Sequence, residues 1–331
     1  MTARGRCEGY KEGSRPAPVV SRFTVGALYG MLCVIWGSTW LAIRIGLEGA
    51  PPFLAAGLRF TLAFAVLLPL LLRRRSKLPR GRTEWSLVVF VGVVLFTIDY
   101  GLIYWGENNG VQSGLSAILF ATFVLQTAIF AHLLLPSERL SAQKLAGIGL
   151  GFAGILLIFR GELATAGLDK FLPMFAIVLS ATCAAISSVA TKRWGHDADT
   201  VTFTALSMAV GAAGLLSLSL LAREPWGVPA WPEGILAIVY LALAGSVVTF
   251  LTYWWLLKRI EATSASYIAM VTPIVAVFLG FTVGSEVLDP LALVGAGITL
   301  AGIFLAVNRR VASWVRRRNA AGAADPPPPP S

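Results

Sequence analysis

Ten apolar blocks alternate with short polar segments along the chain, and they dominate the pattern of its residues. Each block is about 20 residues long, which is the length of helix that a hydrocarbon core of about 30 Å requires. We therefore expect ten transmembrane helices. The blocks cover residues 24–47, 51–72, 85–106, 111–135, 142–159, 171–191, 200–222, 234–257, 262–284 and 290–308.

The first five blocks and the last five are two copies of one unit. Residues 137–140 (Ser-Glu-Arg-Leu) align with residues 285–288 (Ser-Glu-Val-Leu) at an offset of 148 positions, and the same offset places Arg44 opposite Lys192 without a gap. Duplicated membrane units are typical of secondary transporters, whose solute site lies between the two copies. The predicted units are a first repeat over residues 24–159, a linker over 160–170 and a second repeat over 171–308.

Lysine and arginine are distributed unevenly among the predicted loops. Of the 27 such residues, only Arg160, Lys170 and Arg223 fall in loops on one side of the membrane, and Arg44 and Arg59 fall within spans. The basic side is cytoplasmic by the positive-inside rule, which places the 160–170 linker in the periplasm or outside the cell. Both termini, the basic leader 1–23 and the basic, proline-rich tail 309–331, are then cytoplasmic.

This topology requires the two repeats to be inverted. Five spans per repeat is an odd number, so the second copy must cross the membrane in the opposite direction to the first. We predict an all-α integral membrane protein with ten transmembrane helices in two inverted five-helix repeats, located in the cell (inner) membrane.

The composition agrees with a membrane protein and excludes several other classes. The chain is 56% hydrophobic and only 13% charged, whereas soluble domains carry about 25% charged residues. The net charge is +10, and most of the basic residues lie between the apolar blocks. This placement favours contact with anionic membrane lipids and argues against nucleic acid as a partner. Three scattered cysteines and the absence of a Walker-type loop predict no metal site, no cofactor and no direct ATP hydrolysis.

Several motifs resemble a known family. Trp36-Gly37-Ser38-Thr39-Trp40, Ala42-Ile43-Arg44, Pro52 and Arg59-Phe60 are similar to the opening of EamA-type transporters of the drug/metabolite transporter superfamily, as is the repeated Ser-Glu-x-Leu element. The resemblance implies ten helices in two inverted repeats and movement, usually efflux, of small metabolites, along a path surrounded by spans one, three, four, six, eight and nine. The family commonly has a proline midway along the fourth helix of each repeat. Here Pro273 fills that position in span nine but Leu125 does so in span four, so we expect span nine to be the loosened, gating helix and span four to be stiffer.

Four charged residues fall at the depth of the outer half of the membrane. Arg44 and Glu107 lie near the ends of their spans, and they either line an outer vestibule or extend to water by side-chain length alone. Arg59 and Asp99 lie deeper, where ionisable groups pair or face a cavity. We expect Arg59 and Asp99 to interact, either as a structural ion pair or at a place where an anionic or zwitterionic solute competes. Asp99 is also the candidate for proton coupling.

Aromatic and polar residues within the spans supply the remaining candidates for the solute pathway. Trp36, Trp40 and Arg44 recur every four residues and therefore share one face of the first helix. Such a stripe serves helix packing as often as it lines a path. The pathway candidates are Trp36, Thr39, Trp40, Arg59, Asp99, Tyr100, Gln126, Tyr253 and Tyr267.

These features predict a secondary transporter that exports small metabolites, such as amino acids or related compounds, by alternating access. The expected partners are a small-molecule solute and membrane lipids. The glycines at 147 and 151 suit either packing within the chain or a homodimer. An importer or facilitator of a small solute is the alternative. An intramembrane lipid-modifying enzyme is the alternative from another class, although no catalytic cluster of carboxylates or histidines supports it.

Overall fold

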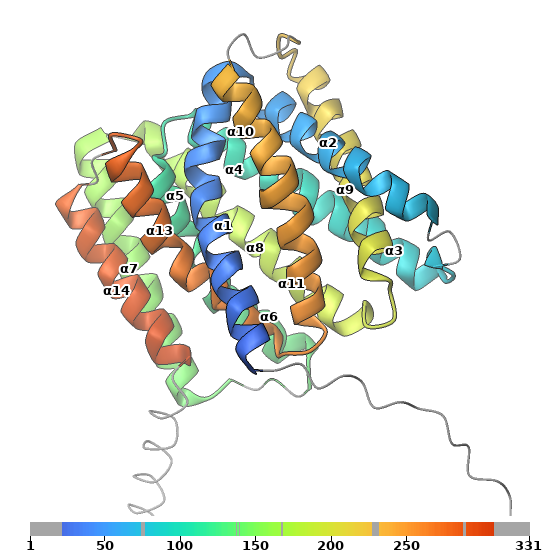
Figure 1. Cartoon of the computed structure of the whole chain (residues 1–331). Helices are drawn as coiled ribbons and strands as arrows, with labels where there is room; N and C mark the ends of the chain where they lie inside the picture. The colour runs from blue at the N-terminus through green and yellow to red at the C-terminus, as the bar shows by residue number, and fades with distance from the viewer. Residues whose placement is uncertain are drawn as a thin grey trace, which may run out of the picture.

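The computed structural model describes residues 22–73, 77–136, 138, 140–166, 168–226, 232–286 and 289–307. Every regular element within these ranges is a helix (Figure 1). Six spans are single helices: α1 (Arg22–Gly49), α2 (Pro52–Arg73), α7 (Ala142–Ala166), α8 (Phe171–Trp194), α9 (Thr200–Leu221) and α14 (Pro290–Val307). The other four spans consist of consecutive segments: α3 (Arg82–Val91), η2 (Gly92–Asp99) and α4 (Tyr100–Asn108); α5 (Ser113–Phe120) and α6 (Phe123–Leu134); α10 (Pro232–Ala242), η4 (Leu243–Val248) and α11 (Thr249–Leu257); α12 (Ala262–Ser266) and α13 (Ile268–Thr282).

The ten predicted spans are confirmed. Nine described helical stretches are long and apolar enough to cross a membrane, and the tenth contains a shorter apolar stretch, Leu293–Leu305. Most observed ends differ from the predicted ones by only a few residues, because polar segments bound each block. The exception is α7, which continues to Ala166, seven residues beyond the predicted end at 159.

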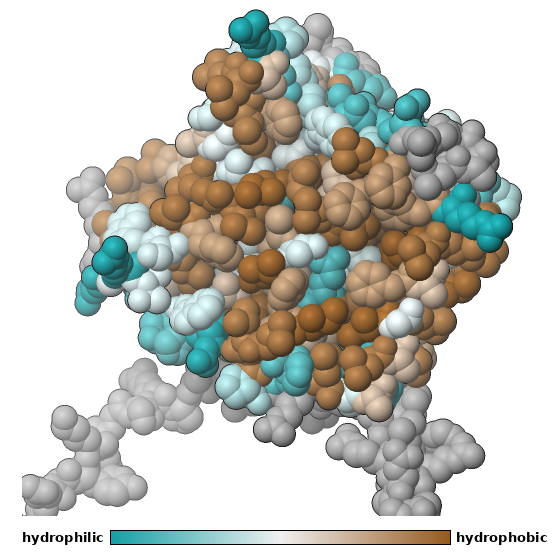
Figure 2. Space-filling model, turned by 180° about the vertical axis from the view of Figure 1, so that it is seen from behind, coloured by the Kyte–Doolittle hydropathy of each residue, from teal (hydrophilic) through white to brown (hydrophobic). Residues whose placement is uncertain are grey.

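Large apolar side chains are exposed on the outside of this bundle. Leu156, Leu236 and Phe281, which lie on three different spans, are each more than 60% exposed. Figure 2 shows apolar residues covering most of the visible face, while hydrophilic residues gather mainly toward its margins. An apolar surface of this extent is stable only against lipid.

The two repeats pack together with approximate two-fold symmetry. The last spans of the repeats, α7 and α14, pack on each other at one flank, and the second spans, α2 and α9, pack on each other at the opposite flank (Figure 1). The remaining spans fill the middle. Arg22 and Val307, the first and last described residues, lie at the same end of the bundle (Figure 1). We call this the Glu138 end and the opposite one the Glu286 end, after the glutamates described below.

Glycines allow the close contact between α7 and α14. A Cβ on Gly154 would lie 2.6 Å from the carbonyl oxygen of Gly295, and a Cβ on Gly302 would lie 2.7 Å from that of Gly147 and 2.4 Å from the nitrogen of Gly151. Backbones approach this closely only where no side chain intervenes. The glycine spacing at 147 and 151 thus serves a contact between the two repeats of one chain.

Both third spans contain a π-helical segment at an equivalent depth, η2 in the first repeat and η4 in the second. A hydroxyl stabilises each one in the same way. Thr97 Oγ1 donates to the carbonyl oxygen of Gly92 at 3.1 Å, and Ser246 Oγ donates to that of Leu241 at 2.9 Å, in both cases five residues back. Such segments are uncommon inside helices and occur frequently at functional sites.

Candidate functional site

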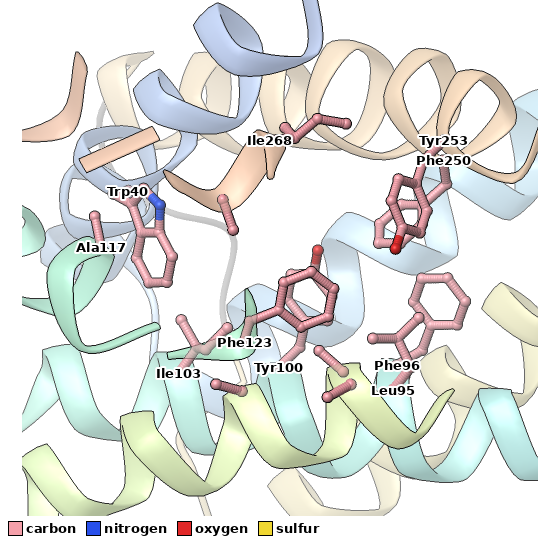
Figure 3. Packing of buried hydrophobic residues seen from close by; sticks show 14 of the residues in the cluster. Trp40, Leu95, Phe96, Tyr100, Ile103, Ala117, Phe123, Phe250, Tyr253 and Ile268 are labelled. Atoms are coloured by element: carbon pink, nitrogen blue, oxygen red, sulfur yellow. The ribbon is translucent and has the colours of Figure 1, made fainter. Parts of the chain in front are cut away.

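A cavity of about 80 Å³ lies in the middle of the bundle, between the repeats. Spans one, three and four of the first repeat and spans six, eight and nine of the second contribute to its wall. Figure 3 shows Trp40, Tyr100, Phe123 and Tyr253 arranged around it from different helices. The lining residues are Trp36, Thr39, Trp40, Ile43, Leu95, Asp99, Tyr100, Ile103, Phe120, Phe123, Ala184, Ser188, Phe250, Tyr253, Trp254, Ala269 and Thr272.

Helical periodicity directs one face of α1 into the cavity. Trp36, Thr39, Trp40 and Ile43 are separated by three or four residues and therefore lie on the same face. The Trp36 ring contacts Phe250 and Tyr253 with centroid distances of 5.6 and 5.2 Å, and Trp40 contacts Phe120 at 5.4 Å. The two Trp36 contacts join the first repeat to the second, whereas the Trp40 contact lies within the first repeat. Arg44, which lies closer to the Glu286 end of α1, does not line the cavity.

Asp99 is the one charged residue among the lining residues that the structure describes. It ends the π-helical segment η2, and only 1% of its surface is exposed. Its Oδ1 has no hydrogen-bond partner among the described residues, and the indole nitrogens of Trp36 and Trp254 are likewise without acceptors there. Three residues of this aromatic wall, Asp99, Trp36 and Trp254, therefore each have a buried polar atom without a partner among the described residues. Buried polar groups of this kind normally have partners.

Arg59 does not line the cavity, and the expected ion pair with Asp99 is absent from the described part of the chain. Its guanidinium instead donates to the second repeat: Nε to Ser246 Oγ at 2.8 Å and Nη2 to the carbonyl oxygen of Gly245 at 2.9 Å. Its Cζ lies 4.7 Å from the centroid of the Tyr100 ring. Arg59 is 1% exposed, so these contacts replace the hydration that a buried guanidinium loses. The carbonyl oxygen of Gly245 belongs to the π-helical segment η4 of the other repeat. The sequence pattern does not reveal that this acceptor lies beside Arg59, because the contact forms only when the repeats pack together.

Arg44 and Glu107, the two charged residues expected near the outer ends of their spans, have different surroundings. Arg44 Nη1 forms an ion pair with Glu286 Oε1 at 2.6 Å. Glu107 is buried, and neither of its carboxylate oxygens has a partner among the described residues. Arg44 is about half exposed while Glu286 is almost fully buried, so Arg44 both extends to the surface and links two repeats.

Glu286 and Glu138 each hold the start of a helix in the other repeat. Glu286 accepts hydrogen bonds at 3.0 Å from the backbone nitrogens of Ser113 and Gly114, which begin α5. Glu138 accepts hydrogen bonds at 2.9 and 3.2 Å from the backbone nitrogens of Ala262 and Thr263, which begin α12. A carboxylate satisfies the unpaired amides of a helix N-terminus and complements its dipole. Each glutamate thus fixes the start of a helix that belongs to the opposite repeat.

A lysine occupies the position at the Glu138 end that Arg44 occupies at the Glu286 end. Lys192 Nζ donates to the carbonyl oxygens of Leu257 and Ile260 at 2.7 and 2.8 Å. These carbonyls lie at and beyond the C-terminus of α11, where a cation is favourable. Arg44 and Lys192, which occupy equivalent positions in the two repeats, therefore each hold another span in place, at opposite ends of the bundle.

The remaining pathway candidates divide between the cavity wall and its supports. Tyr100 and Tyr253 line the cavity, and Tyr253 donates from its hydroxyl to Ser188 Oγ at 3.0 Å. Gln126 lies outside the wall and donates to the carbonyl oxygen of Val178 at 3.3 Å, which joins span four to span six. Tyr267 also lies outside the wall, at the junction of α12 and α13.

Spans four and nine are both interrupted, and the assignment of span nine as the gating helix stays a prediction. Pro273 lies inside the continuous helix α13, whereas span four is interrupted at Ala121 and Thr122 without any proline. There the nitrogen of Thr122 donates to the carbonyl oxygen of Leu119, three residues back. Span nine has a corresponding interruption at Tyr267. Each fourth helix thus has a break near its N-terminal end, where the hydroxyl of Thr122 also takes part in local bonding and competes with regular helix.

Several aromatic residues of the wall were not among the residues predicted from the sequence, above all Phe120, Phe123 and Phe250. A signal for Phe250 was present, because it stands three and four residues before Tyr253 and Trp254 and so shares their helix face. Phe120 and Phe123 flank the interruption of span four, which no local pattern predicts. Their contribution follows only from the irregular backbone.

Ten helical spans in two inverted repeats, with a cavity between them, define a membrane transporter built from a duplicated unit. The chain belongs to the EamA-like transporter family, whose profile matches residues 24–160 and 171–308. It is 32% identical over 283 residues to the "Uncharacterized inner membrane transporter YedA" of Escherichia coli (strain K12), a match that covers 85% of this chain and 89% of that protein. It is 25% identical to the "Uncharacterized transporter YoaV" of Bacillus subtilis (strain 168), with 85% and 96% covered. A crystal structure at 21% identity shares the fold with a TM-score of 0.66, covering 87% of this chain and 98% of that one.

Proposed function

We propose that this transporter exports small metabolites, such as amino acids or related compounds, through the central cavity by alternating access. The observation that carries the proposal is the cavity itself, because both repeats contribute to its wall and its aromatic lining surrounds a single carboxylate. In inverted-repeat transporters the solute site lies at such an interface, and the repeats rock around it. In this mechanism the hydrogen bonds of Glu138 and those of Glu286, at opposite ends of the bundle, open in turn.

Counterflow in proteoliposomes tests the proposal. Vesicles that contain the purified full chain and a high internal concentration of an unlabelled amino acid mixture should accumulate external labelled amino acids transiently. Accumulation should saturate with concentration and be absent from protein-free vesicles. Chemical conversion of vesicle lipids without solute flux would instead support the enzyme alternative. Release of amino acids from cells that express the protein, compared with cells that do not, measures export; net uptake would support an importer.

The proposal includes an inner-membrane location with cytoplasmic termini and proton coupling through Asp99. Asp99 supports coupling because it is the charged group of the wall and has an unpaired oxygen. The residual solute exchange of the Asp99→Asn variant should have a flattened pH profile, and the variant should no longer concentrate solute in response to an imposed pH gradient. A variant with the wild-type rate and pH profile would exclude this role.

A further inference from the structure

The wall of the cavity contains an acceptor that lacks a donor. Asp99 Oδ1 is buried and unpaired among the described residues, and no lysine, arginine or histidine is among the residues that line the same space. A buried acceptor without a partner is costly, and a carboxylate has only acceptor sites when ionised. The group that satisfies it is therefore a donor, and a protonated amine satisfies its charge as well.

The nearby guanidinium does not compete for this role. Arg59 directs its Nε and Nη2 donors to Ser246 and Gly245, and its Cζ lies 4.7 Å from the centroid of the Tyr100 ring. Tyr100 lines the cavity while Arg59 does not. The positive charge is thus held behind the wall, and its Nε and Nη2 donors point away from a solute.

The rings around Asp99 suit the same chemistry. The faces of Trp36, Trp40 and Tyr253 attract cations, and their area buries apolar groups. The unpaired indole N–H groups of Trp36 and Trp254 are neutral donors. They can bind a hydroxyl or carbonyl, but they do not neutralise a carboxylate. The described wall therefore has one charged anchor for a cation and none for an anion.

We propose that the solute is a small organic amine, with its protonated nitrogen at Asp99 and an aromatic or branched apolar body among the surrounding rings. This inference rests on the proposed transport function and narrows it. A carboxylate on the solute is a disadvantage in this cavity, so an arylalkylamine is preferred to the amino acid of the same skeleton.

Four compounds with one ring test the inference in wild-type proteoliposomes. Labelled tyramine carries the amine alone, tyrosine adds a carboxylate, N-acetyltyramine removes the charge, and 3-(4-hydroxyphenyl)propanoate carries the carboxylate alone. We expect tyramine to reach half-maximal exchange at a concentration at least tenfold lower than any of the other three, after subtraction of leakage into protein-free vesicles. Equal or better exchange of the acetylated compound or the propanoate would overturn the inference.

A variant identifies the anchor. Asp99→Asn should reduce tyramine exchange at least tenfold while leaving its elution from a sizing column and its melting temperature close to those of the wild type. Glu48→Gln, at an exposed position outside the cavity, should behave as wild type. Retention of the tyramine preference by Asp99→Asn would overturn the inference, and the wild-type comparison stands even if this variant unfolds.

Failure of the inference differs from failure of the proposed function. Exchange of tyrosine or the propanoate without a preference for tyramine leaves transport intact and overturns only the amine assignment. No saturable exchange of these compounds or of a mixture of amino acids would contradict the proposed transport function and the inference together.

Discussion

Glu138 and Glu286 occupy equivalent positions in the two repeats, and each binds the first two amides of the fourth span of the other repeat. The arrangement is reciprocal: the N-terminus of the fourth span in each repeat is capped by the glutamate of the other repeat. Because the repeats are inverted, one anchor lies at each end of the bundle. The duplicated Ser-Glu-x-Leu element therefore joins the halves of the molecule on both sides of the cavity.

Replacing either glutamate with glutamine should destabilise the protein. Glutamine keeps the shape of the side chain but loses the charge, and one of its two terminal atoms becomes a donor that faces an amide donor. We expect Glu138→Gln and Glu286→Gln each to lower the free energy of unfolding by about 1–3 kcal/mol. Thermal unfolding in detergent measures this effect, with Glu48→Gln as the exposed control. Unchanged melting temperatures would show that the caps contribute nothing to stability.

The contribution of Glu286 should depend on pH. Burial raises the pKa of Glu286, but hydrogen bonds from Gly114 and Ser113 and the Arg44 guanidinium outweigh it and hold that pKa below its ordinary value. A lowered pKa stabilises the fold above the ordinary carboxyl pKa of about 4.3, and this contribution is lost as the pH falls through the lowered pKa. The difference in melting temperature between wild type and Glu286→Gln should be constant near neutral pH and shrink below about pH 4. A difference that grows on acidification would contradict this sign.

Arg59→Lys should weaken the contact between the second and eighth spans. Lysine cannot reproduce the planar set of donors that reaches both Ser246 and Gly245. We expect a loss of about 1–3 kcal/mol in unfolding free energy, with a smaller change in the concentration for half-maximal exchange than Asp99→Asn causes. Arg193→Lys, at an exposed position, is the matched control. A normal melting temperature together with altered solute preference would mean that Arg59 contacts the solute.

Pro273→Ala should slow transport. Proline lacks an N–H and leaves the carbonyl oxygen of Ala269 without its helical donor, and the hydroxyl of Thr272 donates to that oxygen instead. Alanine restores the backbone bond and stiffens α13 beside the cavity. Exchange rates should fall severalfold with little change in half-maximal concentration. Pro69→Ala, in an exposed part of α2, controls for proline removal. An unchanged rate in Pro273→Ala, with transport abolished by disruption of span four, would reverse the assignment of the gating helix.

Cysteine labelling tests the orientation. In a chain whose native cysteines are replaced by serine, Glu48→Cys lies at the Glu286 end and Asp197→Cys at the Glu138 end, both exposed. An impermeant maleimide should label position 48 in intact cells and position 197 only after permeabilisation. The reverse result would place both termini outside the cytoplasm.

The spans were predictable because membrane helices obey a local rule. An apolar run of sufficient length forms a helix wherever it lies in lipid, since its backbone has no other way to pair its polar groups. The helix face that carries Trp36, Thr39 and Trp40 followed from the same regularity. The duplication could also be recognised in the sequence, because the two copies align without insertions or deletions and so keep a constant offset.

The positions of the charged groups were not predictable in the same way. Depth along a helix places Arg59 and Asp99 in one layer, but it does not state which way each side chain points. Arg59 turns to the carbonyl oxygen of Gly245 because the π-helical segment of span eight presents acceptors there. Asp99 instead belongs to the cavity wall.

The sequence by itself determined the ten helices, their duplication and which side chains share a face of α1, since each depends on residues close together in the chain or at a constant offset. Only the tertiary structure decided that Arg44 pairs with Glu286, that the two glutamates cap each other's repeat, and that Asp99 is the charge left in the cavity. Those contacts join residues more than 100 positions apart, and their strength comes from burial and geometry that exist only once the repeats have packed.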